Sequence, residues 1–299
     1  MDRLTARWSS ARWLPLGLIV VAAIGDALTP IGYTWVPLIA AACVLATQVG
    51  PLRVAARYEA ADAEARIGGD AYAIQDTPFG IRILIGDIRG KGIGAVSITT
   101  TLIGAFREAA HHTSSLEELA ERLEQSLGRD QAQHSHTSHD EEFTTALIAE
   151  IDHAGRTLRL LNRGHPAPYL IRSGRVIELL PAEPGLPLGM GDLISQPATT
   201  DTFPLVADDI LLFVTDGVTE ARDASGSFYD PTRLTLPDRR AVTPAEVLDR
   251  LADAVYRWAG GRRDDDMATL AISLSKSDRP SRADASPSPR SPAHPSTPR

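Results

Sequence analysis

Residues 83–94 read ILIGDIRGKGIG, an apolar run that ends in Gly86-Asp87 and passes into a glycine-rich turn with one lysine. A phosphate-binding loop needs four residues between its glycines and then Ser or Thr after the lysine, whereas this turn has three residues and then glycine. The later glycines are spaced G-x-G-x-G, which also differs from the dinucleotide pattern G-x-G-x-x-G. The turn therefore presents an aspartate at the end of a buried strand rather than a nucleotide cradle.

An unpaired carboxylate in that position is costly, and a metal ion is one partner that removes the cost. Three other acidic positions share the setting. Asp70 follows two glycines at the start of a predicted strand, Asp216 ends the apolar run LLFVT with glycine after it, and the triplet 264–266 directly precedes MATLAIS. If these strand ends converge, three or four oxygens surround a hard cation, and ligation by oxygen alone indicates Mg²⁺ or Mn²⁺.

Composition narrows the class of protein. The chain of 299 residues has a net charge of −8 and a pI of about 5.5, so no nucleic-acid partner is expected. Its hydrophobic content of 43% and charged content of 23% are typical of a globular protein. The one cysteine, Cys43, lies in an apolar run, which excludes a disulfide framework or a cysteine-based metal site within one chain.

Residues 1–52 contain two apolar runs, WLPLGLIVVAAIG and WVPLIAAACVLATQVG, and neither reaches about 20 residues by itself. Their aromatic flanks, and the absence of Lys and Arg between them, favour a membrane hairpin of two short transmembrane helices with both ends in the cytoplasm. The catalytic domain is then expected on the cytoplasmic side of the cell membrane. A cleaved signal peptide and a buried helical hairpin are the alternatives.

The rest of the chain divides into three segments. Residues 53–66, RVAARYEAADAEAR, predict a charged, alanine-rich helical linker. Residues 67–275 predict an α+β domain of antiparallel sheets covered by helices, because hairpin strands dominate and helices come in pairs. Residues 276–299 are polar and proline-rich, which predicts a disordered tail. Strands are expected at 70–75, 81–87, 143–152, 157–162, 168–172, 175–180, 209–217 and 267–273, and helices at 94–111, 115–128 and 243–261.

Seven motifs follow one another in the order GGDAY, GDIRGKG, FTTALIAEID, NRGHPAPYL, GLPLG, LLFVTDGVTEARDASGSFY and DDMATL. In this order the chain resembles the PPM/PP2C-type serine/threonine phosphatases of the SpoIIE/RsbU group, over residues 66–275. The resemblance implies an αββα sandwich with two Mn²⁺ or Mg²⁺ ions between the sheets. It also implies a substrate that carries phosphoserine or phosphothreonine, usually an anti-sigma-factor antagonist of the STAS type.

The resemblance also assigns roles to individual residues. Asp87 and Asp216 are the expected catalytic residues, and Asp87 is expected to bridge the metals. The family has a pair of aspartates where this chain has three, residues 264–266. The pair can therefore be aligned in two ways that differ by one residue, because Asp264 precedes the other two. The metal ligands implied are Asp70, Asp87, the backbone carbonyl of Ile88, Asp216 and Asp265. Two departures from the family pattern are Arg163, where alanine is usual in N-A-G-H, and Ala73, where a further Asp is common.

The implied mechanism needs no phosphoenzyme. Two ions about 4 Å apart would hold a bridging hydroxide for in-line attack on phosphorus and offset charge on the phosphoryl oxygens. The sequence offers no convincing nucleophile, because no serine lies in a G-x-S-x-G elbow.

Other candidate residues have weaker support. His165 could protonate the leaving alkoxide, although a structural role in the GHPAP turn is preferred. Lys91 and Arg66 are candidates for contact with the substrate phosphate, with solvated turn residues as the alternative. The stretch HSHTSHDEEF at 134–143 contains histidines without the spacing of a helical zinc site, so a flexible loop is expected there.

The leading hypothesis is therefore a membrane-anchored, metal-dependent phosphoprotein phosphatase, with a possible homodimer through the hairpin. One alternative is a catalytically silent scaffold of the same fold that binds sigma-factor regulators at the membrane. Another is a metal-dependent hydrolase that acts on a different phosphate ester.

Overall fold

The computed structural model describes residues 52–59, 69–89, 93–134, 143–193, 198–237, 242–261 and 265–274. The predicted disordered tail at 276–299 lies outside these residues, and so does the predicted hairpin apart from Leu52. None of the helices in the described ranges is long and apolar enough to cross a membrane.

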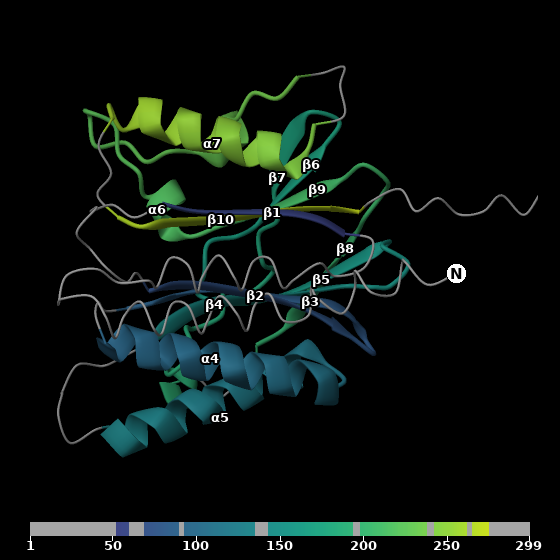
Figure 1. Ribbon diagram of the computed structural model, residues 1–299, viewed down its shortest axis with the longest axis vertical. Coiled ribbons are helices and arrows are strands. Elements are labelled where there is room, and N and C mark those ends of the chain that lie inside the picture. Colours follow the sequence, from purple (N-terminus) through teal and green to yellow (C-terminus); the bar gives the residue numbers. More distant parts are fainter. Residues whose placement is uncertain are drawn as a thin grey trace, which may run out of the picture.

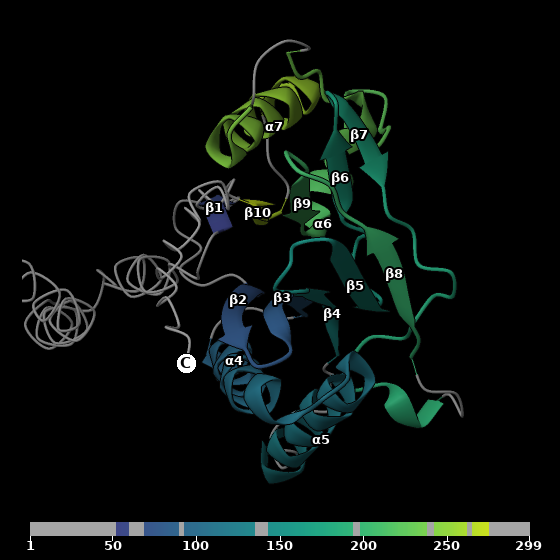
Figure 2. The ribbon, with the colours of Figure 1, turned by 90° about the vertical axis from the view of Figure 1, so that its right-hand side faces the viewer.

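Two antiparallel five-stranded sheets are stacked face to face (Figures 1 and 2). The first sheet has the order β1 (Leu52–Glu59), β10 (Met267–Leu274), β9 (Ile210–Val214), β6 (Tyr169–Arg172) and β7 (Arg175–Glu178). The second has the order β2 (Asp70–Thr77), β3 (Gly80–Ile88), β4 (Thr144–Ile151), β5 (Thr157–Arg163) and β8 (Thr200–Pro204). This arrangement confirms the predicted class of antiparallel sheets covered by helices.

Helices cover the outer face of each sheet, as Figure 1 shows. Short turns of helix occur in the connections. The helices are α4 (Ile93–His112) and α5 (Leu116–His134) on the second sheet, α7 (Pro244–Trp258) on the first, and the short α6 (Asp216–Thr219), η1 (Gly191–Leu193) and η2 (Pro231–Arg233).

Every second residue of a strand faces the opposite sheet, because side chains alternate between the two faces. The core between the sheets is therefore made of alternating apolar residues. From the second sheet it takes Ile81, Ile83 and Ile85 of β3 and Leu147 and Ala149 of β4; from the first it takes Leu211 and Phe213 of β9 and Leu270 and Ile272 of β10.

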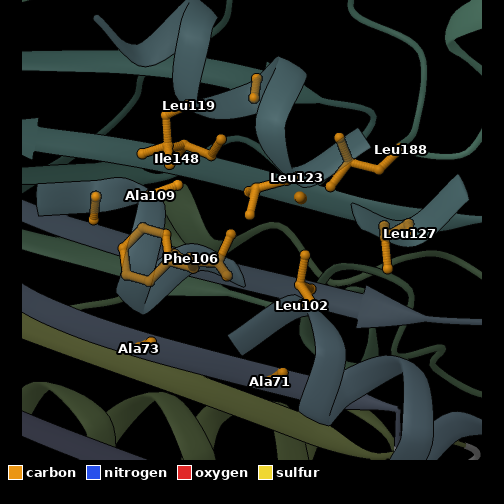
Figure 3. Close-up of a cluster of buried hydrophobic side chains, with 14 of the residues drawn as sticks. Ala71, Ala73, Leu102, Phe106, Ala109, Leu119, Leu123, Leu127, Ile148 and Leu188 are labelled. Atoms are coloured by element: carbon orange, nitrogen blue, oxygen red, sulfur yellow. The ribbon is translucent and has the colours of Figure 1, made fainter. Parts of the chain in front are cut away.

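The outer face of the second sheet packs against α4 and α5, and Figure 3 shows this cluster. Phe106 of α4 and Leu119 of α5 are fully buried there beside Ile148 of β4. On the other side of the molecule, the buried face of α7 packs against the outer face of the first sheet. The start of α7 is fixed by a capping box in which Thr243 and Glu246 bond reciprocally.

The prediction of a helical linker at 53–66 is wrong for its first half. Residues Leu52–Glu59 form β1, which pairs with β10 along its whole length. Leu52, Val54 and Ala56 enter the core between the sheets. The alanines and charged residues favour a helix. As an edge strand, however, the segment buries apolar side chains in the core, and this burial contributes more free energy than the low strand propensity of its residues costs. Residues 52–59 therefore belong to the sandwich, whereas 60–66 lie outside the described residues.

Candidate metal centre

The acidic site lies where the apolar faces between the sheets come to an end. On β3, Ile81, Ile83 and Ile85 point into the core, and the next residue on that face is Asp87. On β2 the same face carries Ile74 and Tyr72 and then Asp70. The β2–β3 register places Asp70 directly opposite Asp87. Side chains paired on one face of antiparallel strands are close neighbours.

The facing sheet repeats this pattern at the same end of the sandwich. On β9, Leu211 and Phe213 face the core, and the next residue on that face is Thr215. The Thr215 hydroxyl donates to Asp70 Oδ2 over 2.9 Å and accepts from the Ala268 N–H over 2.9 Å. A hydrogen bond therefore joins the two sheets at the acidic site, and it brings Asp216, the residue after Thr215, beside the acids of the second sheet.

The segment before β10 supplies two more carboxylates. Asp266 continues the inner face of β10, and the Tyr58 hydroxyl of β1 donates to Asp266 Oδ2 over 2.9 Å. Asp265 is exposed, and its Oδ1 accepts from the Asp266 N–H over 2.9 Å. The carboxylates of Asp265 and Asp266 both act electrostatically on Asp87. The assignment of Asp265 rather than Asp266 as a ligand stays a prediction.

Burial and mutual repulsion disfavour the ionised form of these acids. Burial, followed by the charge of Asp87, raises the pKa of Asp70 from 3.8 to about 8. Burial and the charge of Asp216 raise the pKa of Asp87 to about 6. Burial and the charge of Asp265 also raise the pKa of Asp216. These interactions show that acids from four separate segments lie near enough to act on one another electrostatically.

Two glycines explain how the backbones approach so closely. A Cβ on Gly69 would collide with the carbonyl oxygen of Ile88 and lie 2.9 Å from Asp87 Oδ1. A Cβ on Gly217 would collide with the carbonyl oxygen of Asp266. Only a residue without a side chain fits at either point, so the GGD and TDG motifs allow the acidic segments to come together.

The donor set fits a hard divalent cation. It consists of carboxylate oxygens, which Mg²⁺ and Mn²⁺ prefer as ligands. The Ile88 carbonyl stays a predicted ligand. A cation would also stabilise the carboxylate forms that burial disfavours. Within the described ranges, no three His, Cys, Asp or Glu side chains are close enough to form a complete metal site. Lys91, Arg66 and Asp264 lie outside the described residues.

The structural role preferred for His165 agrees with its surroundings. The side chain is buried at 5% exposure, and burial lowers the pKa of His165 to about 3. A neutral imidazole without access to solvent does not supply a proton to a substrate at neutral pH.

Removing the metal should make stability depend on pH through Asp70. Its pKa is higher in the folded state than in the unfolded state, so ionisation favours unfolding. In chelator, we expect the thermal midpoint of the wild type to fall as the pH rises from about 4 to about 8. Asp70→Asn should remove most of this fall, and Asp76→Asn, at an exposed acid of the same strand, should not. Equal pH slopes for wild type and Asp70→Asn would contradict the assignment.

Arg163 stands where alanine is usual in the family. Its side chain binds both the segment that follows β7 and helix α5. Its Nε donates to the Leu186 carbonyl over 2.6 Å, and its Nη2 donates to Glu124 Oε2 of α5 over 2.8 Å. Glu124 Oε1 in turn accepts from the N–H groups of Gly189 and Gly191 over 2.8 and 3.1 Å. The arginine and glutamate therefore hold the GLPLGMG segment against α5.

Arg163→Ala should lower the free energy of unfolding by about 2 kcal/mol, because it removes hydrogen bonds that involve a charged group and leaves the Leu186 carbonyl without its donor. Urea denaturation measures the change. Arg175→Ala, on the exposed face of β7, is the matched control and should change the free energy by less than about 0.5 kcal/mol. Equal midpoints for the two variants would show that the contacts of Arg163 contribute nothing.

Sequence reasoning missed the hydroxyl partners of the acids, which are Tyr58 and Thr215. The sequence predicts a helix around Tyr58, and the TDG motif indicates the aspartate as a ligand without giving a role to the threonine. Side chains two residues apart on a strand point to the same face. Tyr58 and Thr215 each stand two residues after the last apolar residue of the inner face, Ala56 and Phe213, and this spacing identifies both.

Comparisons with known proteins identify the family and the fold of this chain. The family model described as Stage II sporulation protein E (SpoIIE) matches residues 77–275. The phosphoserine phosphatase RsbP of Bacillus subtilis (strain 168) is 29% identical over 174 residues, which are 56% of this chain and 40% of that protein. This chain therefore matches less than half the length of that curated relative.

Solved structures show the same fold. The PP2C phosphatase domain of SpoIIE from Bacillus subtilis, solved with a fragment of its regulatory domain, has a TM-score of 0.60 at 19% identity and covers 75% of this chain and 63% of that chain. The catalytic domain of the serine/threonine phosphatase PstP, solved with two manganese ions, has a TM-score of 0.52 at 17% identity and covers 74% and 98%.

Proposed function

Because this chain belongs to the Stage II sporulation protein E (SpoIIE) family, we propose that it is a metal-dependent protein serine/threonine phosphatase. The observation that carries the proposal is the convergence of Asp70, Asp87, Asp216 and the pair 265–266 at one end of the sandwich. Related proteins are named as a phosphoserine phosphatase and as a phosphatase with two manganese ions, which supports the reaction class.

The residues of this chain have distinct roles in the proposal. Asp87 and Asp216 are the catalytic residues, and together with Asp70, Asp265 and the Ile88 carbonyl they hold two Mn²⁺ or Mg²⁺ ions. Thr215 holds Asp70 in place across the sheet interface. When bound, such ions activate water for attack on phosphorus and offset charge on the phosphoryl oxygens.

The proposed substrate is a phosphoserine or phosphothreonine of a signalling protein, with an anti-sigma-factor antagonist of the STAS type as the first candidate. The experiment is an assay of phosphate release by the full chain from a phosphoserine peptide and from a small phosphomonoester, with Mn²⁺, with Mg²⁺ and after chelation. Release from the peptide that stops on chelation supports the proposal. Release from the small ester alone indicates a different phosphate-ester hydrolase, and no release with either substrate indicates a silent scaffold.

We also propose that residues 1–52 anchor the protein in the cell membrane as a two-helix hairpin, with the catalytic domain in the cytoplasm and a homodimer formed through the hairpin. The sequence pattern of two apolar runs with arginines only on the outer flanks supports this. Fractionation of cells that express the full chain tests it. Recovery of the full chain in the soluble fraction as a monomer would contradict both the anchor and the dimer.

A further inference from the structure

The edge strand β1 carries none of the predicted metal ligands, yet its C-terminal end reaches the acidic site. Its inner face carries apolar residues as far as Ala56. Side chains two residues apart on a strand share a face, so Tyr58 continues this face beyond the core. Tyr58 pairs with Ala268 in the β1–β10 register. The tyrosine therefore stands where the apolar core ends and the acids begin.

The Tyr58 hydroxyl binds one carboxylate of the site. It donates to Asp266 Oδ2 over 2.9 Å. Asp266 lies two residues before Ala268, so the contact is a diagonal one between neighbouring strands, and a long aromatic side chain can span such a pair. A hydrogen bond to an ionised acceptor is stronger than one between neutral groups. The tyrosine therefore has both the reach and the chemistry to hold this carboxylate.

Asp266 connects the segment before β10 to the rest of the site. Its N–H donates to Asp265 Oδ1 over 2.9 Å. Its carbonyl lies against Gly217, where a Cβ would collide with it, and Gly217 directly follows Asp216. The carboxylate of Asp266 also acts electrostatically on Asp87. A change in the position of Asp266 would therefore affect acids on several strand ends.

The neighbouring strand end has the same arrangement of hydroxyl and acid. The Thr215 hydroxyl donates to Asp70 Oδ2, and the Thr215 N–H donates to the Ala268 carbonyl over 3.1 Å. Thr215, Ala268 and Tyr58 thus lie in one row across the ends of β9, β10 and β1. Two hydroxyls in this row each bind an acid of the site.

We propose that Tyr58 is a positioning residue of the metal centre: its hydroxyl orients Asp266, and through Asp266 the acidic pair 265–266, towards the acids of the other strand ends. The metal affinity of the centre therefore depends on a hydroxyl from the edge strand β1. This inference rests on the proposed function, because it takes the acidic site to bind metal.

The inference is tested by Mn²⁺ binding to the full chain in calorimetry. Tyr58→Phe keeps the ring and removes the hydroxyl, and it should weaken Mn²⁺ binding about 10-fold, an effect typical of residues that orient metal ligands. The Mn²⁺ concentration for half-maximal phosphopeptide hydrolysis should rise by the same factor. The KM for the peptide at saturating Mn²⁺ should stay unchanged. Tyr256→Phe on α7 is the matched control, because this tyrosine is 51% exposed and Tyr58 is 46% exposed, and it should bind Mn²⁺ like the wild type.

A second control separates the hydroxyl from the docking of β1. Arg57, on the outer face of the strand, pairs with Glu59 over 2.6 Å and with Asp249 of α7 over 3.0 Å. Arg57→Met removes these ion pairs and leaves Tyr58 unchanged, so its Mn²⁺ affinity should equal that of the wild type. Equal weakening in Arg57→Met and Tyr58→Phe would overturn the proposal, because the docking of the strand rather than the hydroxyl would then be responsible.

Wild-type Mn²⁺ affinity in Tyr58→Phe would also overturn the proposal. The same holds for a higher KM or a lower kcat at unchanged Mn²⁺ affinity, because the hydroxyl would then act on the substrate instead of on the metal centre. A wild-type chain that binds no Mn²⁺ would contradict the proposed function itself together with this inference. The two failures are therefore distinguishable by the wild-type titration.

Discussion

Replacing Arg82 with methionine should lower the free energy of unfolding by about 3–5 kcal/mol, because it leaves a buried carboxylate without its partner. Arg82 has no exposed side-chain surface, and its Nε and Nη2 both lie 2.8 Å from Glu150 Oε2. The two residues are directly paired on β3 and β4 and point to the outer face of the sheet. Methionine keeps an unbranched apolar stem in place of the stem of arginine but supplies no donor.

The same guanidinium also binds carbonyl groups at the C-terminal end of α4. Its Nη1 donates to the carbonyls of Ala110 and Thr113 over 2.9 and 2.7 Å, and its Nη2 donates to the Ser114 carbonyl over 3.3 Å. The last carbonyls of a helix have no partner within the helix. Arg82→Met would leave them unsatisfied in the core and would loosen the turn between α4 and α5.

Arg159→Met is the matched control, because Arg159 Nη1 donates to the other oxygen of the same glutamate over 3.1 Å from a side chain that is 53% exposed. A half-exposed ion pair contributes less than about 1 kcal/mol. Urea denaturation of both variants measures the difference. If Arg82→Met unfolds at the same urea concentration as Arg159→Met, the buried network does not stabilise the fold as we infer.

Asp87→Asn should reduce phosphopeptide hydrolysis by about 1,000-fold, because a metal centre supplies several kcal/mol of transition-state stabilisation and each 1.36 kcal/mol is tenfold in rate. Asparagine keeps the size of the side chain and removes its charge. The metal-free variant should be at least as stable as the wild type, since burial and Asp216 disfavour the aspartate. Loss of activity with unchanged or higher stability separates this effect from unfolding.

The measurements are phosphate release at saturating Mn²⁺ and the thermal midpoint in chelator. Asp253→Asn, at an exposed acid on α7, controls for the loss of one negative charge and should keep full activity. Retention of more than a tenth of the wild-type activity by Asp87→Asn would remove Asp87 from the centre of the proposed site.

Most strands of the sandwich could be predicted, because the character of their side chains alternates between the two faces of each strand. The run at 81–87 became β3 with small changes of boundary, whereas the strand predicted at 209–217 ends at Val214 as β9, because Asp216 begins the short helix α6. The segment at 53–59 was predicted as a helix, since its alanines and charges hide an alternation that matters only beside β10. The short edge strand β8 at 200–204 was missed because TDTFP carries little apolar signal.

The candidate site was predictable to the level of its acids. Asp70, Asp87 and Asp216 stand at strand ends beside glycine, and that local signal is legible in the sequence. Their partners were not predictable, because Thr215 and Tyr58 contact acids that are 145 and 208 residues away along the chain. Such contacts depend on how the sheets are stacked.

The amino-acid sequence by itself determined which side of each strand is apolar and where an acid interrupts it, because both are properties of a two-residue repeat. The tertiary structure decided which acids meet, which hydroxyl holds each of them, and that Arg82 and His165 are buried. Those outcomes depend on the antiparallel register and on the facing of two sheets whose strands come from distant parts of the chain. A local sequence pattern does not say which distant strands become neighbours, so only the folded structure shows these contacts.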